Sequence, residues 1–444
     1  MKGYERYKQS NFPWINEVPY HWNIYSLNHV VEFIMGQAPH SDSYNTEGSG
    51  TVFIKTGDFT DLIPIVKWYT TTPLVYASKN DVFICVVGAT CGKVNLGIDG
   101  TISRSIAALR PKKLVLQKYL FYYLSFNYIS LNDSAQGSAQ GIINKSILAS
   151  IKIPIPPLSE QIQIASFLDK KTALIDEIIA KKERLIETLQ AKRQATINEV
   201  VTGKKVWNPK TNTWTEASKV KNSGIDWLGE IPEDWEVVKL KYLVSKVGSG
   251  VTPRGGGEVY YDEGVIFVRS QNVHFDGLRL EDIVRIDIET HENMSGSKVQ
   301  RNDVLLNITG ASIGRCCVVN VDDEINVNQH VSILRTNERV FPYFLNLVLQ
   351  SSIGQLQVNL KSSGGNREGL TAEAIKTFII PLPKKNEQLI IIDKLGELIS
   401  HFETTIFRIQ TQIQKLKEYR QSLISEAVTG KIDVRDWQAL GSKA

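Results

Sequence analysis

Cysteine and histidine are scarce in this chain, and the few that occur are not spaced like metal ligands. Among 444 residues there are four cysteines, Cys85, Cys91, Cys316 and Cys317, and seven scattered histidines. Because no Cys-x-x-Cys pair is present, neither a zinc site nor a disulfide framework is predicted. The simplest interpretation is a reduced, cytoplasmic setting.

Long hydrophobic runs are also missing. The first residues, MKGYERYKQSNFPW, carry charges but no apolar segment of signal-peptide length. Charged residues interrupt the apolar runs well before the roughly 18 residues that a membrane-spanning helix needs. We therefore expect a chain that is neither secreted nor membrane-spanning.

The common catalytic motifs do not occur. Walker A, H-E-x-x-H and G-x-S-x-G patterns are missing, and so is the E-x-K triplet of restriction-type nucleases. The Pro156-Pro157 pair is followed by Leu158, so the [DNS]-P-P-[YFW] motif of amino-methyltransferases is absent, as is an F-x-G-x-G cofactor loop. These absences favour a binding protein over an enzyme, with no metal or cofactor of its own.

The composition is that of an ordinary globular protein, with 42% hydrophobic and 22% charged residues. The length predicts about three domains. The net charge of +4 permits nucleic-acid binding without requiring it.

The strongest pattern in the chain is a heptad repeat over residues 386–429. Apolar residues recur there at 3-4 spacing, with polar residues on the other faces, which predicts a helix of roughly 65 Å that pairs with another helix. The predicted seam residues are Ile392, Leu395, Ile399, Phe402, Ile406, Ile409, Ile413 and Leu416.

The partner helix is in the same chain, because residues 385–429 align without a gap onto residues 158–202. The matching seam residues are Leu168, Ile175, Ile179, Ile186 and Leu189. Arg193 and Arg420 align with each other at one seam position, where we expect each to find a carboxylate or to set the register; the alternative is that each reaches solvent. The chain is therefore a tandem duplication.

The duplication extends into the regions that precede the helices. The segment 14–22 aligns with 227–235, both beginning and ending in tryptophan, and Gly36-Gln-Ala-Pro39 aligns with Gly250-Val-Thr-Pro253. Glycine-rich segments follow, but neither fits a phosphate-binding loop, so flexible hairpins are favoured over a nucleotide pocket. The polar loops at 134–141 and 362–369 are candidate DNA-facing loops.

Polar and basic residues follow the apolar strand patterns at the same places in both copies, and their side chains are types that read base edges or bind phosphate. The candidate DNA-binding residues are Lys55, Thr56, Asp58, Lys93, Ser103 and Arg104 in the first copy, and Arg269, Ser270, Gln271, Asn272, Arg315, Asn328, Gln329 and His330 in the second. Lys93 and Arg315 close the two G-A-[ST]-x-G-[KR] turns, which could hold a DNA phosphate on exposed backbone N–H groups. Solvated strand ends would have a similar composition, so a structural alternative stays open for each.

These motifs, in the same order twice, resemble the specificity subunit of type I restriction-modification systems. The resemblance rests on residues 223–237 and their first-copy counterpart, the G-A-[ST]-x-G turns, IPIPPLSEQ at 153–161, and the long helices that end in V-T-G-K. It implies an α+β fold in which two target-recognition domains, each a curved β-sheet with small helices, are separated by two long antiparallel coiled-coil helices in a pseudo-two-fold internal repeat. The expected parts are a first domain (1–157), a spacer helix (158–204), a linker with the second domain (205–383), a second spacer helix (384–431) and a tail (432–444).

The resemblance also implies a non-catalytic subunit of a DNA methyltransferase and endonuclease complex. Each domain would read one half of a split, asymmetric site on double-stranded DNA, and the helix pair would set the gap and dock two modification (methyltransferase) subunits. Motor and restriction subunits would join them, and S-adenosylmethionine, ATP and Mg²⁺ would belong to these partners. The alternative is a coiled-coil adaptor that binds only protein. Salt-sensitive, sequence-dependent DNA binding by the complex separates the two.

Overall fold

The computed structural model describes residues 2–12, 15–127, 142–253, 260–362 and 369–437, and the chain divides into two compact units. Unit 1 comprises residues 1–183 and 410–444, and unit 2 comprises residues 184–409. Trp14, the glycines at 255–257, the polar loop at 134–141 and the interior of the loop at 362–369 lie outside the described residues.

One sheet of unit 1 is antiparallel and runs in the order β10-β9-β12-β4. Its strands are β4 (Val31–Met35), β9 (Val82–Cys85), β10 (Val94–Leu96) and β12 (Ile106–Pro111). A second sheet runs in the order β5-β7-β6-β11-β8, and within it β6 and β11 are parallel. Its strands are β5 (Tyr44–Asn45), β6 (Thr51–Ile54), β7 (Trp68–Thr70), β8 (Tyr76–Ala77) and β11 (Gly100–Ile102).

Unit 2 repeats this topology except that its second sheet has no strand matching β5. Its antiparallel sheet runs β19-β28-β25-β26, with strands β19 (Val244–Ser249), β25 (Val304–Asn307), β26 (Cys316–Val318) and β28 (Val331–Thr336). Its mixed sheet runs β23-β20-β27-β24, with strands β20 (Val265–Val268), β23 (Val284–Ile286), β24 (Lys298–Val299) and β27 (Ile325–Val327). The pair β20 and β27 is parallel, as β6 and β11 are in unit 1.

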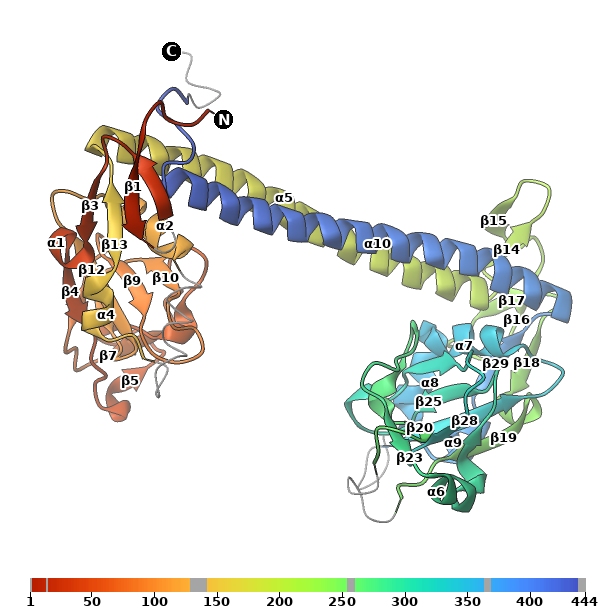
Figure 1. Ribbon diagram of the computed structural model, residues 1–444. Helices are drawn as coiled ribbons and strands as arrows, with labels where there is room; N and C mark the ends of the chain where they lie inside the picture. Colours follow the sequence, from red (N-terminus) through yellow and green to blue (C-terminus); the bar gives the residue numbers. More distant parts are fainter. Residues whose placement is uncertain (1, 13–14, 128–141, 254–259, 363–368, 438–444) are drawn as a thin grey trace. The chain divides into compact units, whose positions relative to one another are not determined.

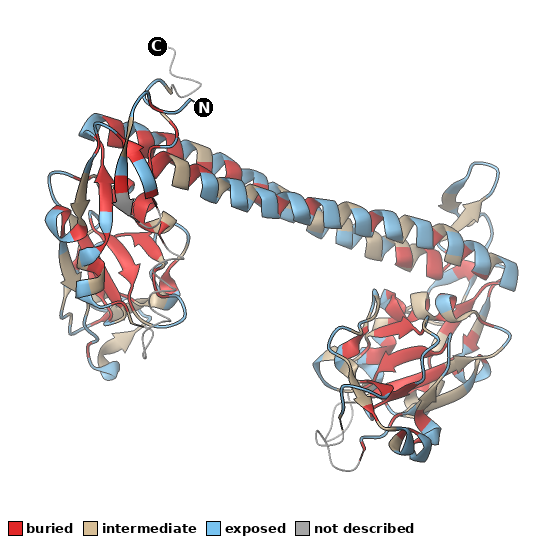
Figure 2. Ribbon diagram, in the orientation of Figure 1, coloured by how far each residue is buried: buried red, intermediate tan, exposed pale blue. Residues whose placement is uncertain are grey.

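The sheets form because their strands are short runs of β-branched and aromatic residues. Every residue of β9, β20 and β25 is buried, and the buried residues of Figure 2 concentrate on the sheets of each domain. A strand that is buried on both faces needs a layer of structure on each side of its sheet. Each of these sheets is therefore packed against other elements of its domain. In unit 1, Ile54 of β6 and Phe83 of β9 lie in one buried cluster.

Smaller elements complete each domain. In unit 1, β1 (Tyr7–Phe12) pairs with β2 (Ile15–Pro19) and β3 (Asn23–Ser26) pairs with β13 (Lys152–Ile155); in unit 2, β16 (Val220–Asn222) pairs with β17 (Glu230–Pro232) and β18 (Glu236–Lys239) with β29 (Ile379–Leu382). The short helices are α1 (Leu27–Val30), α2 (Gln117–Phe126) and α4 (Lys145–Ser150), then α6 (Ile288–Asn293), α7 (Pro342–Gln350), α8 (Ser352–Ser362) and α9 (Ala372–Lys376). Unit 2 also contains the hairpins of β14 (Lys205–Asn208) with β15 (Thr213–Glu216) and of β21 (Val273–His274) with β22 (Gly277–Leu278).

Two long helices follow the domains, α5 (Leu158–Val201) and α10 (Lys385–Val428), and they lie side by side in antiparallel orientation (Figure 1). In unit 1 the ammonium of Lys182 donates to Oε1 of Gln412 at 2.6 Å. Among the described residues, no helix is long and apolar enough to cross a membrane. The fold class predicted from the sequence is confirmed in its duplicated α+β domains and its antiparallel long helices.

Candidate nucleic-acid interface

The predicted residues of each domain gather where the parallel strands end. Ser103 N donates to the carbonyl of Ile54 at 3.0 Å in unit 1, and Asn328 N donates to the carbonyl of Val268 at 3.1 Å in unit 2. These bonds join the residue after β11 or β27 to the last residue of β6 or β20. Lys55 and Arg269 follow immediately in the chain. Each domain therefore presents polar and basic residues on one sheet edge.

The two basic residues at this edge lie over aromatic rings. The ammonium of Lys55 is 3.7 Å from the ring centroid of Trp68 and 4.4 Å from that of Tyr44. Burial lowers the pKa of the Lys55 ammonium from its ordinary value. The Arg269 guanidinium lies 5.8 Å from the ring centroid of Tyr260. Both cations are therefore held by cation–π contacts that restrict their position.

Asp58 and Asn272 differ from the others because both are buried. Oδ2 of Asp58 accepts from Lys55 N at 2.8 Å, and Oδ1 of Asn272 accepts from Arg269 N at 3.0 Å. Each side chain closes a short 3₁₀ turn, η2 (Thr56–Asp58) or η5 (Ser270–Asn272). This placement favours a structural role over the DNA contact predicted from the sequence. Thr56 and Ser270 are half-buried within these turns, and Gln271 is exposed.

The G-A-[ST]-x-G turns connect β9 to β10 and β25 to β26, and their glycines have the positive φ that was predicted, at Gly88 (92°), Gly92 (88°), Gly310 (74°) and Gly314 (85°). The prediction of exposed backbone N–H groups, however, is wrong for the second half of each turn. Gly92 N donates to the Cys85 carbonyl and Gly314 N to the Asn307 carbonyl, both at 2.8 Å. Since the following N–H groups of Lys93 and Arg315 also bond within the turn, these amides cannot hold a phosphate.

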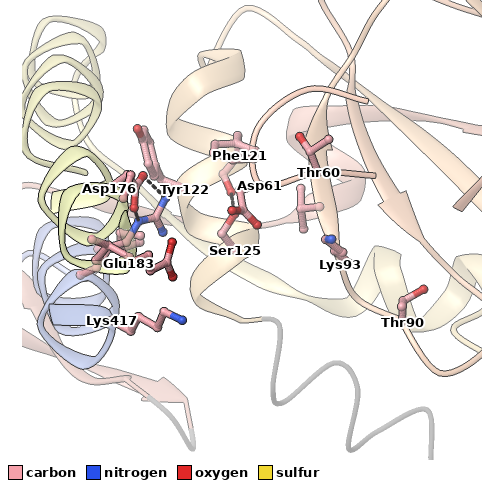
Figure 3. A pocket seen from close by; sticks show the side chains of 15 residues that line it. Thr60, Asp61, Thr90, Lys93, Phe121, Tyr122, Ser125, Asp176, Glu183 and Lys417 are labelled. Atoms are coloured by element: carbon pink, nitrogen blue, oxygen red, sulfur yellow. Dashed lines mark hydrogen bonds and ion pairs between the residues drawn. The ribbon is translucent and has the colours of Figure 1, made fainter. Parts of the chain in front are cut away.

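The two basic residues of these turns have different surroundings. Lys93 is half-buried, and its ammonium donates to the carbonyl of Phe59 at 3.2 Å. It also lines a groove of about 780 Å³ between the domain and the helix pair of unit 1 (Figure 3). Arg315 is half-buried as well, but within the described part of the chain its guanidinium forms no ion pair. Arg315 is therefore the freer of the two cations.

The turns at residues 103–106 and 328–331 have the same backbone structure. Ile106 N donates to the Ser103 carbonyl at 2.9 Å, and Val331 N donates to the Asn328 carbonyl at 3.1 Å. Both turns lie directly against the glycine of the motifs at 36–39 and 250–253. A Cβ added to Gly36 would be 2.2 Å from the Ser103 carbonyl oxygen, and one added to Gly250 would be 1.8 Å from that of Val327. Close approach of the backbone, which only glycine allows, explains these two motifs.

The side chains on the second turn form a hydrogen-bonded group. His330 Nδ1 bonds to Oγ1 of Thr309, and His330 Nε2 is 3.2 Å from Nε2 of the exposed Gln329. Oδ1 of the buried Asn328 accepts from His330 N at 3.1 Å. On the first turn Ser103 is buried and Arg104 is exposed. The turns are thus alike in backbone and different in the side chains that they present.

Two ion pairs that lie away from the polar edge, one in each domain, were not predicted from the sequence. Arg110 Nε is 2.9 Å from Asp81 Oδ1, and Arg335 Nε is 2.8 Å from Asp303 Oδ1, with both carboxylates fully buried. The hydrogen bonds to Asp81 and Asp303 raise the pKa of each guanidinium. The repeat of both residue types at matching positions was the signal that could have revealed them.

The seam residues predicted from the heptads all face inward. Leu168, Ile175, Ile179, Leu395, Phe402, Ile409 and Ile413 are buried, while Ile186, Leu189, Ile392, Ile399, Ile406 and Leu416 are half-buried. The expectation that Arg193 and Arg420 find carboxylates is confirmed. Arg420 Nε is 2.9 Å from Asp176 Oδ1 in unit 1. In unit 2, Arg193 NH2 is 3.2 Å from Glu403 Oε1.

The Glu-Gln pair in the first turn of each helix anchors the helix to its domain. Oε1 of Glu160 accepts from Trp22 Nε1, and Oε2 of Glu387 accepts from Trp235 Nε1, both at 3.0 Å. The neighbouring glutamines bond to backbone groups of the domain in both units. Gln161 Oε1 accepts from Leu116 N at 2.8 Å, and Gln388 Oε1 accepts from Phe341 N at 2.9 Å. Trp22 and Trp235, the last residues of the two matched sequence phrases, therefore serve as docking points for the helices.

No cluster of histidine, cysteine and carboxylate side chains that could hold a metal ion occurs in residues 2–12, 15–127, 142–253, 260–362 and 369–437. All four cysteines are buried thiols that form no disulfide. Burial raises the pKa of Cys91, Cys316 and Cys317, which disfavours the reactive thiolate.

Fold and sheet edges together define a duplicated α+β chain in which each domain carries one polar edge and the two domains share a pair of long helices. The family model described as type I restriction modification DNA specificity domain matches residues 19–188 and 232–415, and this chain belongs to that family. The resemblance stated from the sequence is thereby confirmed. Both matches extend from a domain into the long helix that follows it.

Relatives cover the chain almost from end to end. It is 25% identical to the MjaVIII specificity subunit of Methanocaldococcus jannaschii, over 97% of this chain and 98% of that protein. It is 24% identical to the EcoBI specificity subunit of Escherichia coli, over 94% of this chain and 87% of that protein. Both relatives are type I restriction enzyme subunits by name.

Solved structures agree on the fold. A chain from work on complex assembly and conformational transition of the type I R-M system has a TM-score of 0.72 at 17% identity, covering 94% of this chain and 99% of the other. The HsdS subunit of Thermoanaerobacter tengcongensis has a TM-score of 0.50 at 16% identity, covering 94% of this chain and 98% of the other.

Proposed function

We propose that this chain is the non-catalytic DNA sequence-specificity subunit of a type I restriction-modification complex. Each domain reads one half of a split, asymmetric site on double-stranded DNA. The helix pair sets the gap between the halves and docks two modification subunits, and motor and restriction subunits complete the complex. S-adenosylmethionine, ATP and Mg²⁺ are bound by those partners and not by this chain.

The observation that carries this proposal is the pair of matching sheet edges. Each edge has one basic residue held over aromatic rings, Lys55 or Arg269, beside a turn whose exposed side chain differs between the domains. Cations placed beside hydrogen-bonding side chains suit a surface that binds phosphates and reads base edges at the same time. The two turns have the same backbone structure but present different side chains, which suits two different half-sites.

The helices support the roles of spacer and docking surface. Their seams are mainly apolar, so the pair suits a stiff element of defined length. On the outer face of α5 in unit 1, Leu174 is 51% exposed and Ile178 is 36% exposed. Apolar side chains one turn apart on the solvent face of a paired helix suit a further helix of a partner protein.

Sequencing of genomic methylation with and without the gene for this chain tests the proposal. Loss of one split, asymmetric motif on deletion is the expected result, and that motif identifies both half-sites and the gap. An unchanged methylation pattern, together with an assembled complex that binds DNA without sequence preference, supports the protein-only adaptor instead. Methyl transfer or DNA cleavage by the purified chain alone would contradict the non-catalytic role.

A further inference from the structure

The turn after the second parallel strand is held to the sheet edge of each unit by backbone hydrogen bonds. In unit 1, Gly36 N donates to the Ile106 carbonyl at 3.0 Å and Gln37 N donates to the Ile102 carbonyl at 3.1 Å. In unit 2, Gly250 N donates to the Val331 carbonyl at 3.1 Å. Because a glycine backbone lies against each turn and the neighbouring strand binds its first residue, the turn cannot shift without breaking the sheet edge.

Each turn raises one side chain into solvent at the same position. That residue is Arg104 in unit 1 and Gln329 in unit 2, and both are exposed while the preceding Ser103 and Asn328 are buried. Within the described residues of unit 1, Arg104 forms no ion pair or side-chain hydrogen bond. Its guanidinium is therefore available to an external acceptor.

Gln329 is held in place by its neighbours. Nε2 of Gln329 donates to Nε2 of His330 across 3.2 Å, and the other ring nitrogen of His330, Nδ1, is hydrogen-bonded to Oγ1 of Thr309. One amide hydrogen of Gln329 is thus used, and its Oε1 and second N–H stay free. In unit 1 the positions of His330 and Thr309 are taken by Ser105 and Val87, which cannot form this chain of bonds.

We infer that Arg104 and Gln329 are the specificity-determining residues of the two domains, that Arg104 reads a guanine and Gln329 an adenine in the major groove, and that His330 and Thr309 position Gln329. A guanidinium matches the two acceptors of guanine, O6 and N7, whereas one donor and one acceptor on an amide match N7 and the N6 amino group of adenine. Lys55 and Arg269, next to the turns, contact the flanking phosphates. This inference rests on the proposed function and names the side chains that differ between the half-sites.

Exchange of the two readers tests the inference. Assembled complexes carrying Arg104→Gln or Gln329→Arg are compared with the wild type for binding to a library of randomised duplexes. Arg104→Gln should relax the preference for G at one base pair of the first half-site, because Ser105 and Val87 cannot position a glutamine as His330 and Thr309 do. Gln329→Arg should change one base pair of the second half-site from A to G. The preference at that base pair should change by about 5- to 150-fold, with the rest of the motif unaltered.

Thr309→Val tests the positioning role with a side chain that the first domain already has at this place. It should relax the preference at the base pair that Gln329 reads, while affinity for unrelated DNA stays the same. Arg301→Gln removes an exposed positive charge before β25, far along the strand from this turn, and should leave the motif unchanged.

The outcomes distinguish a failure of the proposed function from a failure of the residue assignment. A wild-type complex without any sequence preference removes the proposed function. A wild-type complex with a split motif that stays identical in both exchanged variants overturns only the assignment of Arg104 and Gln329. If Thr309→Val lowers affinity equally for all duplexes, Thr309 and His330 stabilise the fold and do not position Gln329.

Discussion

Arg420 of α10 binds Asp176 of α5 through two hydrogen bonds, Nε to Oδ1 at 2.9 Å and NH2 to Oδ2 at 3.2 Å. The aligned residues Arg193 and Glu403 form the matching pair in unit 2, with the arginine now on α5 and the carboxylate on α10. An antiparallel pair of duplicated helices produces this exchange, because each helix carries both an arginine and a carboxylate and the arginine of one meets the carboxylate of the other. The two pairs favour one register of the seam.

Removal of one carboxylate measures how much this ion pair contributes to the free energy of unfolding. Asp176→Ala should lower the free energy of unfolding by about 1 kcal/mol, because Arg420 is 27% exposed and loses its partner at a seam position. The double exchange Asp176→Arg with Arg420→Asp should restore most of the loss. Glu177→Ala, which removes the neighbouring exposed carboxylate, is the control and should leave the denaturation midpoint unchanged. Equal effects at 176 and 177 would contradict a role in register.

The glycine after each long helix should be irreplaceable. Gly430 has φ of +74°, and a Cβ there would lie 2.3 Å from Cδ of Pro19. Gly430→Ala should therefore destabilise unit 1 by about 2 kcal/mol in urea denaturation, through backbone strain and overlap. Gly396→Ala is the matched control, because nothing lies within 4 Å of its added Cβ inside α10, and it should stabilise by about 0.5–1 kcal/mol. Similar results for both variants would show that the helix end is not tightly packed.

Glu387 should make the stability of unit 2 pH-dependent. Burial raises the pKa of its carboxyl above the ordinary value, although the Trp235 hydrogen bond opposes this. The folded state thus binds more protons than the unfolded state between the two pKa values, and stability falls as pH rises through that window. Glu387→Gln should remove this pH dependence. The free energy of unfolding of the variant, relative to that of the wild type, should therefore increase from pH 4 to pH 7. Urea titrations at several pH values measure it, with the exposed Glu397→Gln as control; a constant difference across pH would refute the assignment.

Arg315 should contribute to DNA affinity without choosing a sequence. Arg315→Ala in the assembled complex should weaken binding to specific and unrelated duplexes alike, and should reduce the slope of log affinity against log salt by about 1. Arg269→Ala should also weaken binding, since its guanidinium is held at the same edge. Arg301→Ala, before β25, should change neither quantity. Unchanged affinity of the Arg315 variant at several salt concentrations would remove it from the interface.

The long helices should act as the ruler for the split site. Insertion of one heptad at aligned positions in both helices keeps the seam in register and adds about 10 Å. The gap in the methylated motif should then lengthen by about three base pairs, at 3.4 Å each. Insertion of four residues into one helix alone puts its seam out of register and should impair assembly. A motif with its original gap after the paired insertion would show that another element sets the spacing.

Sequence reasoning was most successful where a pattern repeats over many residues. The heptads of α5 and α10 identified the inward-facing positions, since each a and d residue must face the partner helix whatever the domains do. It was least successful for single polar residues. Asp58 and Asn272 are residue types that can read bases. In the structure, however, each side chain accepts a hydrogen bond from the backbone N–H at the start of its own 3₁₀ turn. The amides of Gly92 and Gly314 looked available for a phosphate, but they bond to carbonyls across their own turn.

The chain by itself determined the duplication, the α+β domains, the two long helices and the family, because all of these follow from local periodicity and from the order of short motifs. Only the tertiary structure decided which polar side chains are free. Lys55 lies over Trp68 because β6 pairs with the antiparallel strand β7, and His330 bonds to Thr309 because β28 pairs with β25. Neither contact can be read from the local sequence, because each depends on which strands pair. A polar side chain has the same hydrogen-bonding groups whether it is buried or exposed. Its neighbours in the folded chain decide whether those groups bond within the protein or stay available to DNA.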